Sequence, residues 1–178
     1  MVNALQIKNE RGYYLIIQEP LQFDDAQAFS KTLGGNLAQF ESQEESDLLW
    51  ATISSDQAID ALKPTWFSTL ANDGGEVPYL WIGGDDKDTE SSRNSDNWNW
   101  QWTLSGQEIL SDRNEWGNGF LGSEPDNYLD NQNRLALGLQ DWPLNNPGAL
   151  GYAGQWNDLN ANNKLWFIVE IPREFDIN

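Results

Sequence analysis

Two short triplets rich in oxygen donors most constrain what this chain can fold into. Glu124-Pro125-Asp126 stands at one end of the segment 124–158, and Trp156-Asn157-Asp158 stands at the other. Calcium selects hard oxygen ligands and takes six to eight of them. Proline fixes its own φ and favours extended geometry at the preceding residue, so we expect Glu124 and Asp126 to point outward together. A fold that joins the two triplets would build a cation site.

The net charge of the chain limits the kinds of partner that we expect it to bind. The sequence has 28 acidic and 10 basic residues, a formal net charge of −18. Such a charge argues against binding to nucleic acid and to anionic membrane surfaces. No apolar run approaches the roughly 20 residues of a membrane span, so we expect no membrane insertion. The length of 178 residues favours one domain with an adequate core.

Cysteine and histidine are both absent from the sequence. Their absence excludes disulfides, thiol catalysis and histidine-ligated zinc, and it removes the commonest general base. Aromatic residues make up 12% of the chain and include ten Trp. Exposed aromatic faces can stack on sugar rings, but large aromatics also fill the core of a loop-rich fold. We expect roughly two-thirds of the Trp residues to lie in the core.

The first half of the chain predicts a strand and two helices. Residues 12–17 form a β-prone run. Residues 23–33 predict a helix with Ala26, Phe29 and Leu33 on its inward face, and Gly34-Gly35 ends it. Residues 43–54 predict a second helix, because Ser42 and Glu45 form a capping box. In this helix we expect Leu49 and Ile53 to point inward.

The second half predicts mainly strands. Residues 56–79 read as loops and turns. Strands are expected at 80–84, 134–139, 155–158 and 165–171, and the last of these should pair with the strand at 12–17. Trp98, Trp100 and Trp102 alternate, so on a strand they share one face. These elements together predict a mixed α+β domain with antiparallel strands.

The order of these motifs resembles the C-type lectin domain family. The resemblance rests on the first helix with its Gly34-Gly35, on Leu80-Trp81-Ile82-Gly83-Gly84, on the alternating Trp strand with Gly106 and Trp116 after it, and on the two triplets. It covers about residues 12–171. It implies one domain over residues 1–178 with a C-type lectin-like fold, two helices, antiparallel sheets and a long calcium-binding loop region.

The resemblance also implies that this version of the domain has lost its disulfides. The half-cystines of the family fall at Ser30, Arg134, Ala161 and Val169. All four are replaced together, which leaves no orphan thiol. A bridge typically contributes about 2–4 kcal/mol, which extra Trp burial could replace. Such a thiol-free version suggests a bacterial protein exported by a route that forms no disulfides.

The resemblance implies two calcium sites. The ligands of the principal site are Glu124, Asp126, Gln132, Asn157 and Asp158. The family usually has Glu at position 132 and, in mannose binders, Asn at position 126, so the carboxylate count stays at three. The ligands of a weaker auxiliary site are Asp86, Glu90, Asn127 and Asn133, with Gln132 shared between the two sites.

A calcium-dependent carbohydrate-binding module is the function that the resemblance implies, with calcium as the cofactor and a glycan as the partner. Sugar hydroxyls would ligate the calcium, and the residues that contact the sugar would be Glu124, Asp126, Gln132, Asn157 and Tyr128. Asp126 and a stacking Tyr128 favour galactose-type sugars, whereas Glu124 favours mannose-type sugars as the runner-up.

Other functions remain open on the same scaffold. One is a protein-binding or adhesion module in which calcium is purely structural. Catalysis is not expected, because the residues of acid–base and nucleophilic chemistry are missing and the paired carboxylates are committed to a cation. Met1-Val2-Asn3-Ala4 begins no signal peptide. We therefore expect an extracellular or cell-surface protein whose export signal was removed, or a module of a longer exported chain.

Overall fold

The computed structural model describes residues 4–8, 12–86, 92 and 96–172. Within these residues the chain forms three α-helices, two short 3-10 helices and nine strands. The helices are α1 (Phe23–Thr32), α2 (Gln43–Ile53), α3 (Asp56–Leu62), η1 (Lys63–Thr69) and η2 (Tyr128–Asp130). The strands are β1 (Ala4–Lys8), β2 (Gly12–Leu21), β3 (Asn36–Leu37), β4 (Leu70–Ala71), β5 (Val77–Asp86), β6 (Trp100–Trp102), β7 (Arg134–Gly138), β8 (Trp156–Leu159) and β9 (Leu165–Pro172).

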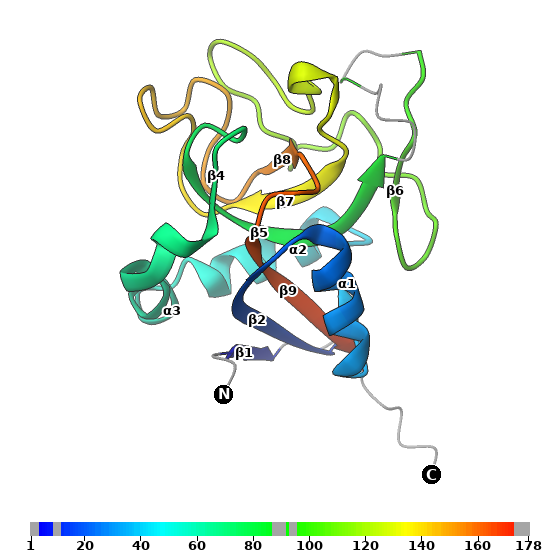
Figure 1. Cartoon of the computed structure of the whole chain (residues 1–178), viewed down its shortest axis with the longest axis vertical. Helices are drawn as coiled ribbons and strands as arrows, with labels where there is room; N and C mark the ends of the chain where they lie inside the picture. Colours follow the sequence, from blue (N-terminus) through cyan, green and yellow to red (C-terminus); the bar gives the residue numbers. More distant parts are fainter. Residues whose placement is uncertain (1–3, 9–11, 87–91, 93–95, 173–178) are drawn as a thin grey trace.

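The strands form one mixed sheet with the order β1-β2-β9-β5-β7-β8. Neighbouring strands run antiparallel except β5 and β9, which are parallel. β2 pairs with β9, with Tyr13 opposite Ile171, so the predicted pairing of the first and last strands is confirmed. Strand β1 was not predicted and adds to the outer edge of β2. Figure 1 shows β2 and β9 at one end of the molecule and the long loops gathered around β7 and β8 at the other.

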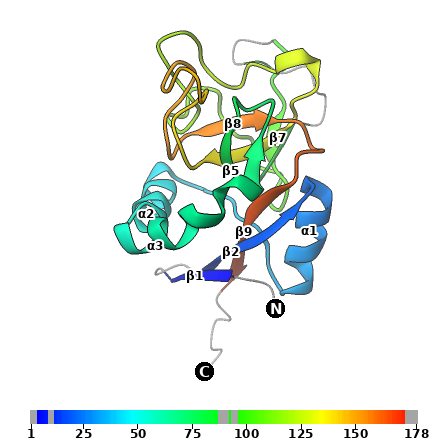
Figure 2. The same ribbon diagram turned by 60° about the vertical axis from the view of Figure 1, so that its left-hand side comes forward.

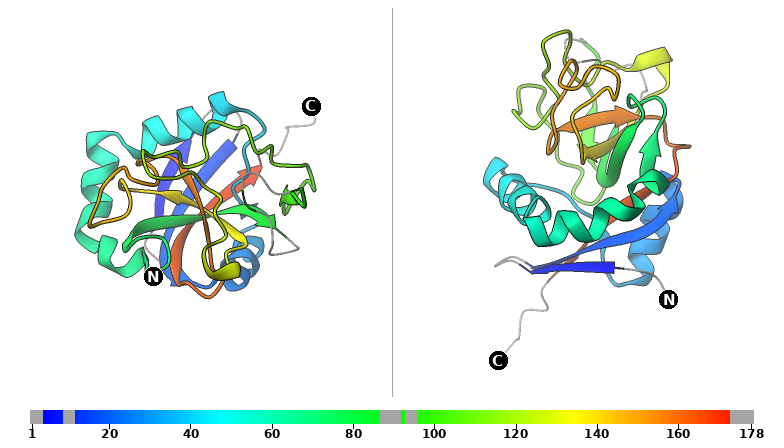
Figure 3. Two further views of the ribbon diagram at one scale, coloured as in Figure 1. Left: turned by 90° about the horizontal axis from the view of Figure 1, so that it is seen from above. Right: turned by 90° about the vertical axis from the view of Figure 1, so that its left-hand side faces the viewer.

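The sheet has an apolar core on each face, because alternate residues of a strand point to opposite sides. On β5, Tyr79 and Trp81 pack with α1, whereas Leu80 and Ile82 pack with α2. β9 divides its side chains between the two cores in the same way. Seen from above, α1 and the pair α2–α3 lie on opposite sides of the sheet (Figure 3).

The two predicted helices are confirmed, with one error in a buried face. In α2, the Ser42 side chain accepts a hydrogen bond from the Glu45 N–H, and Leu49 and Ile53 are buried as expected. In α1, Phe23, Ala26 and Ser30 form the buried face. Leu33 was expected inside, but it caps the helix and is exposed, because α1 ends one residue before it.

The interpretation of residues 56–79 as loops and turns was incomplete. Helix α3 and the 3-10 helix η1 occupy 56–69 without a break, and β4 follows. The turn at 72–75 and the strand after it are as expected, although β5 begins three residues before the predicted start at Leu80. None of the helices in the described part of the chain combines the length and apolar character needed to cross a membrane.

Seven of the ten Trp side chains are buried, close to the expected two-thirds. Trp156 is the centre of the largest aromatic group. Its ring stacks with Phe40 at 6.0 Å and meets Trp102 and Trp116 edge-on at 5.5 and 5.9 Å. The guanidinium of Arg113 lies 4.8 Å from the same ring. These contacts fix the strand residue that directly precedes Asn157 and Asp158.

Other contacts stand at the positions that the resemblance assigns to half-cystines. Arg134 forms an ion pair with Asp85 at 3.4 Å, and its guanidinium lies 5.1 Å from the Phe23 ring. Ser30 donates a hydrogen bond to the Ala26 carbonyl within α1, and Val169 lies in the core. These positions are therefore packed or hydrogen-bonded although they hold no cysteine.

Candidate metal and ligand site

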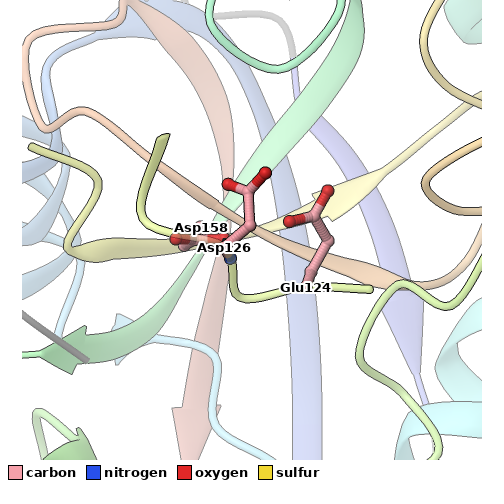
Figure 4. Close-up of side chains that lie close together, drawn as sticks. All are labelled: Glu124, Asp126 and Asp158. Atoms are coloured by element: carbon pink, nitrogen blue, oxygen red, sulfur yellow. The ribbon is translucent and has the colours of Figure 1, made fainter. Parts of the chain in front are cut away.

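Three carboxylates converge where the long loops meet β8. Glu124, Asp126 and Asp158 each place an oxygen within 4.8 Å of the others. Figure 4 shows Glu124 and Asp126 rising from one loop segment with their carboxylates side by side, and Asp158 next to them. Glu124 and Asp158 are buried and Asp126 is exposed. The expectation that both loop carboxylates point outward is therefore wrong for Glu124, whose side chain turns into the protein.

The buried ring of Trp142 holds Glu124 in this inward position. The indole nitrogen donates a hydrogen bond of 3.1 Å to Oε1 of Glu124. Gly117, Gly138 and Gly151 pack directly on the same ring, and a Cβ atom at any of them would lie 2.1 to 2.7 Å from it. The Glu124–Pro125 and Trp142–Pro143 peptide bonds are both cis.

Asp158 joins the two triplets. Its Oδ1 accepts a hydrogen bond from the Asp126 N–H at 3.2 Å, and its Oδ2 accepts one from the Asn127 N–H at 2.8 Å. The carboxylate therefore bridges β8 to the loop after Pro125. Each carboxylate oxygen has more than one acceptor direction, so these bonds leave Asp158 able to contact a cation as well.

The loop after Asp126 has unusual backbone conformations. Asn127, Leu129 and Asp130 have φ values of 49°, 61° and 55°, in the left-handed region that L side chains other than Asn and Asp rarely adopt. The Tyr128 N–H donates to Oδ1 of Asp126 at 3.0 Å and to Oε1 of Gln132 at 2.7 Å. These bonds hold the loop in its tight path, and the Tyr128 side chain is 55% exposed.

Gln132 is buried and is linked to the turn at 72–75 by Asp73. Its Nε2 donates to the Asp73 carbonyl at 3.1 Å and to Oδ2 of Asp73 at 3.4 Å. The Asp73 carboxylate also accepts from the Asn160 N–H at 2.8 Å and from Nδ2 of Asn163 at 2.6 Å. Asp73 thus fastens Gln132 and the β8–β9 turn to the turn between β4 and β5.

Asn157 is buried beside Tyr79. Its Nδ2 donates to the Tyr79 hydroxyl at 2.9 Å, and that hydroxyl donates to the Gly74 carbonyl at 2.8 Å. The amide oxygen of Asn157 takes no part in these bonds. Burial raises the pKa of Tyr79 well above its usual value, so its hydroxyl stays protonated. The hydrogen bond to the Tyr79 hydroxyl therefore fixes the orientation of the Asn157 side chain.

Burial and mutual repulsion disfavour the state in which all three carboxylates are ionised. Burial, and then the charges of Asp158 and Asp126, raise the pKa of Glu124 well above its usual value. Burial and the charge of Asp126 raise the pKa of Asp158 to about 8, although backbone N–H groups oppose this. Burial also raises the pKa of Asp126. Oxygen ligands in such a group match the preference of calcium, whose charge would relieve the repulsion.

A cavity of about 240 Å³ opens beside the carboxylates. Its walls include Glu124, Asp126, Gln132 and Asn157, four of the five predicted principal ligands. Tyr128 lies at the same cavity, so the residues expected to contact a sugar do share one surface. Asp158, the fifth predicted ligand, lies behind this surface among the three carboxylates.

The predicted auxiliary ligands are less well assembled in the described residues. Asp86 is buried at the end of β5, where its N–H donates to the Asn133 carbonyl at 3.1 Å. Asn127 is buried too, and its Oδ1 accepts a hydrogen bond from the Gln132 N–H at 3.1 Å, within the loop that follows Asp126. Glu90 lies outside the described residues. Among the residues that are described, the group of three acidic side chains forms at the principal site.

Asp73, Tyr79 and Trp142 are site residues that the sequence reasoning missed. All three line the cavity or hold its walls. Asp73 was interpreted as part of a turn, and Trp142 as part of a loop over residues 141–151 that contains Pro143 and Pro147. The sequence carried one signal that could have identified Trp142, namely a large aromatic residue directly before Pro143 in a predicted loop.

The comparisons identify the fold. A mouse scavenger receptor C-type lectin carbohydrate-recognition domain is 23% identical, with a TM-score of 0.60 over 96% of this chain and 95% of that one. A cow CD23 C-type carbohydrate-recognition domain, solved in the presence of a GlcNAc2Man3 oligosaccharide, is 18% identical, with a TM-score of 0.59 over 96% and 95%. Herring type II antifreeze protein is 19% identical, with a TM-score of 0.55 over 95% and 97%.

No protein-family model matches the chain, and no match is found among curated proteins. The protein therefore has the predicted C-type lectin-like fold, and it contains no cysteine and no disulfide. The described residues form three α-helices where two were predicted, and the sheet is mixed because β5 and β9 pair in parallel. The first two of these structures are described as carbohydrate-recognition domains.

Proposed function

We propose that this protein is a calcium-dependent carbohydrate-binding module. The observation that carries the proposal is the convergence of Glu124, Asp126 and Asp158 beside a cavity that Glu124, Asp126 and Tyr128 line. An isolated group of carboxylates would be a weak argument. Here the group lies beside a cavity and on the fold of known carbohydrate-recognition domains.

Five side chains would hold the calcium. Glu124, Asp126 and Asp158 would supply carboxylate oxygens, and Asn157 would supply its amide oxygen. Gln132 would supply its amide oxygen, which already accepts the Tyr128 N–H and has a second acceptor direction. A bound calcium supplies open coordination positions to which two neighbouring sugar hydroxyls can bind. Asp86, Glu90, Asn127 and Asn133 form a weaker proposal for a second ion.

The residues around the calcium would also recognise the sugar. Glu124 and Asp126 can accept hydrogen bonds from sugar hydroxyls, and Asn157 retains one amide hydrogen after its bond to Tyr79. The exposed Tyr128 ring offers an apolar face at the same cavity. We therefore propose a galactose-type ligand, with a mannose-type ligand as the runner-up because of Glu124.

A protein-binding or adhesion role is the second candidate. It is supported by Phe120 and Leu121, which are 64% and 69% exposed in the turn beside the candidate site. The Leu121 N–H donates to the Ala149 carbonyl at 2.8 Å, so this turn lies next to the segment that carries Leu150 of the cavity wall. In that role the calcium would be purely structural. Either role fits a module of an exported protein that acts outside the cell or at its surface.

One experiment separates these functions. On a glycan array probed with calcium and with EGTA, calcium should add binding to glycans that are not bound in EGTA, and Asp158→Asn should lose this added binding. Calcium should raise the melting temperature, because binding at a hundredfold excess over Kd adds about 2.7 kcal/mol. Glu45→Gln is the matched control, since Glu45 is a buried carboxylate that accepts a hydrogen bond from Tyr14 and does not line the cavity.

The outcomes are distinct. Calcium-dependent stability without glycan binding would favour the protein-binding role. A melting temperature indifferent to millimolar calcium in the wild type would remove the calcium site from the proposal.

A further inference from the structure

One groove is lined by two Trp residues that are only partly buried in the core. Neither residue belongs to the candidate site. Trp50 of α2 and Trp66 of η1 are half-buried, and both line a groove of about 600 Å³. This volume lies within the range of about 300–1,000 Å³ typical of small-molecule sites. The groove shares no lining residue with the cavity beside Glu124.

We propose that this groove is a second carbohydrate-binding site, independent of calcium, which takes a neutral saccharide. The inference goes beyond the proposed function of the carboxylate site and does not depend on it.

Both indole rings line the groove and also pack against the core, which limits their movement. The Gly154 backbone lies directly against Trp50, since a Cβ atom at Gly154 would be 2.6 Å from Nε1 and Cε2 of that ring. Nε1 of Trp66 is fully buried and makes no hydrogen bond, although the residue itself is half-exposed. The exposed part of the Trp66 ring is therefore carbon. A carbon surface of this kind is what the C–H face of a sugar ring can stack on.

Polar side chains on the groove walls suit sugar hydroxyls, which both donate and accept hydrogen bonds. Gln140 offers an amide with donors and an acceptor. Asp141 uses Oδ1 to accept the Ala153 N–H at 2.9 Å, so its other oxygen can accept from a ligand. Both residues are half-buried, which limits the freedom that they would lose on binding.

The charge of the groove favours a neutral ligand. Its lining contains one cation, Lys63, and one anion, Asp141. Lys63 lies 3.6 Å from Asp60 in an exposed pair, and the chain as a whole has a net charge of −18. An anionic sugar would meet this field unfavourably. A single carboxylate cannot form a calcium site, so binding here should not require the ion.

The segment 139–153 separates the two sites. Trp142 and Leu150 of this segment line the cavity beside Glu124, whereas Asp141, Pro147 and Ala153 line the groove. Figure 2 shows this orange segment above helices α2 and α3. Trp50 of α2 and Ile59 of α3 line the groove on that side. Each site therefore has its own walls and can be disabled separately.

The test is an array of immobilised neutral glycans probed with the labelled protein in EGTA. We expect binding that Asp158→Asn leaves unchanged. Trp66→Ala and Gln140→Ala should each weaken it roughly two- to tenfold, the range expected for an aromatic or polar contact of this kind. Trp66→Phe should retain most of the binding, because it keeps an aromatic face.

Phe67→Ala is the matched control, since Phe67 is 74% exposed, adjacent in sequence and outside the groove lining. Gln140→Ala keeps the test valid if Trp66→Ala fails to fold, as melting curves would reveal. The proposal is overturned if no neutral glycan binds in EGTA. It is equally overturned if binding in EGTA is the same in all the groove variants, or if only peptides compete for the groove. Loss of calcium-dependent binding alone would count against the carboxylate site and not against the groove.

Discussion

The indole nitrogen of Trp142 donates a 3.1 Å hydrogen bond to Oε1 of Glu124. This bond fixes the least accessible of the loop carboxylates at the cavity, because Glu124 is 2% exposed and has a raised pKa. A donor that is itself buried and tightly packed cannot move away when the carboxylate changes its charge. The orientation of Glu124 is therefore set by the core and not by solvent.

Trp142→Phe tests this relationship. The variant keeps an aromatic ring but removes the donor, and a hydrogen bond to a charged group contributes about 1.5–3 kcal/mol. We expect a lower melting temperature and a weaker calcium affinity by calorimetry. Trp98→Phe is the control, since it removes an indole bond to the Ile109 carbonyl at 2.7 Å, away from the cavity. If both variants bind calcium like the wild type, Trp142 does not position Glu124 for a cation.

Stability should fall as pH rises only when calcium is absent. The pKa of Asp158 is about 8 in the folded protein, above the value of about 3.9 in an unfolded chain. Between these values the folded state binds more protons, so stability in EGTA falls as pH rises from 4 to 8. Saturating calcium should remove this loss, and calcium affinity should increase with pH over the same window.

Melting curves at pH 5 and pH 8, with calcium and with EGTA, measure this effect directly. Asp158→Asn should make the fall in EGTA shallower, because one of the three carboxylates with a raised pKa no longer titrates. A wild-type profile in EGTA that rises from pH 5 to pH 8 would mean that the carboxylates are not held together as described.

Tyr128→Ala should weaken galactose binding and leave calcium binding intact. The Tyr128 ring is exposed at the cavity, so its removal costs a ligand contact and no core packing. We expect a loss of roughly 0.5–1.5 kcal/mol, taken from the strength of aromatic contacts. Competition between free galactose and free mannose on the wild type and the variant provides the measurement. A wild type that prefers mannose, with an unchanged variant, would reverse the assignment of sugar class.

Asp73→Ala should destabilise the side of the site that is formed by the turn at 72–75. The substitution removes the acceptor of Asn160 and Asn163 and one of the two acceptors of Gln132. Leaving such groups unsatisfied costs about 1–3 kcal/mol for each that stays buried. We expect a lower melting temperature together with weaker glycan binding. Asp60→Ala, at an exposed surface pair, should change neither quantity.

The parts of the fold that could be predicted from the sequence are those whose cause is local. The capping box of α2 and the β-prone runs that form β5 and β9 depend on neighbouring residues, and these elements were predicted correctly. Helix α3 was missed because it is a single short element followed directly by Pro64, so turn-forming residues dominated the reading. Leu33 was misplaced because a periodic pattern does not specify the last helical residue.

The part of the site that could be predicted from the sequence is limited to its two triplets. Glu124, Asp126 and Asp158 carry a recognisable motif, and the fold brings them together. Asp73 reaches Gln132 across 59 positions in the sequence, and Trp142 reaches Glu124 across 18. Contacts of that range arise from the packing of the loops and leave no local pattern in the chain.

The packing of three glycines on Trp142 links positions that are otherwise far apart in the sequence. Gly117, Gly138 and Gly151 are small because one indole ring occupies the space where their side chains would be. A homologous chain with a smaller residue at 142 would free that space at all three places at once. Among such chains we expect side chains at 117, 138 and 151 to appear together with the loss of the indole, and position 124 to lose its glutamate in the same lineages. Covariation among these five positions would trace the carboxylate site through sequences too divergent to align by the triplets alone.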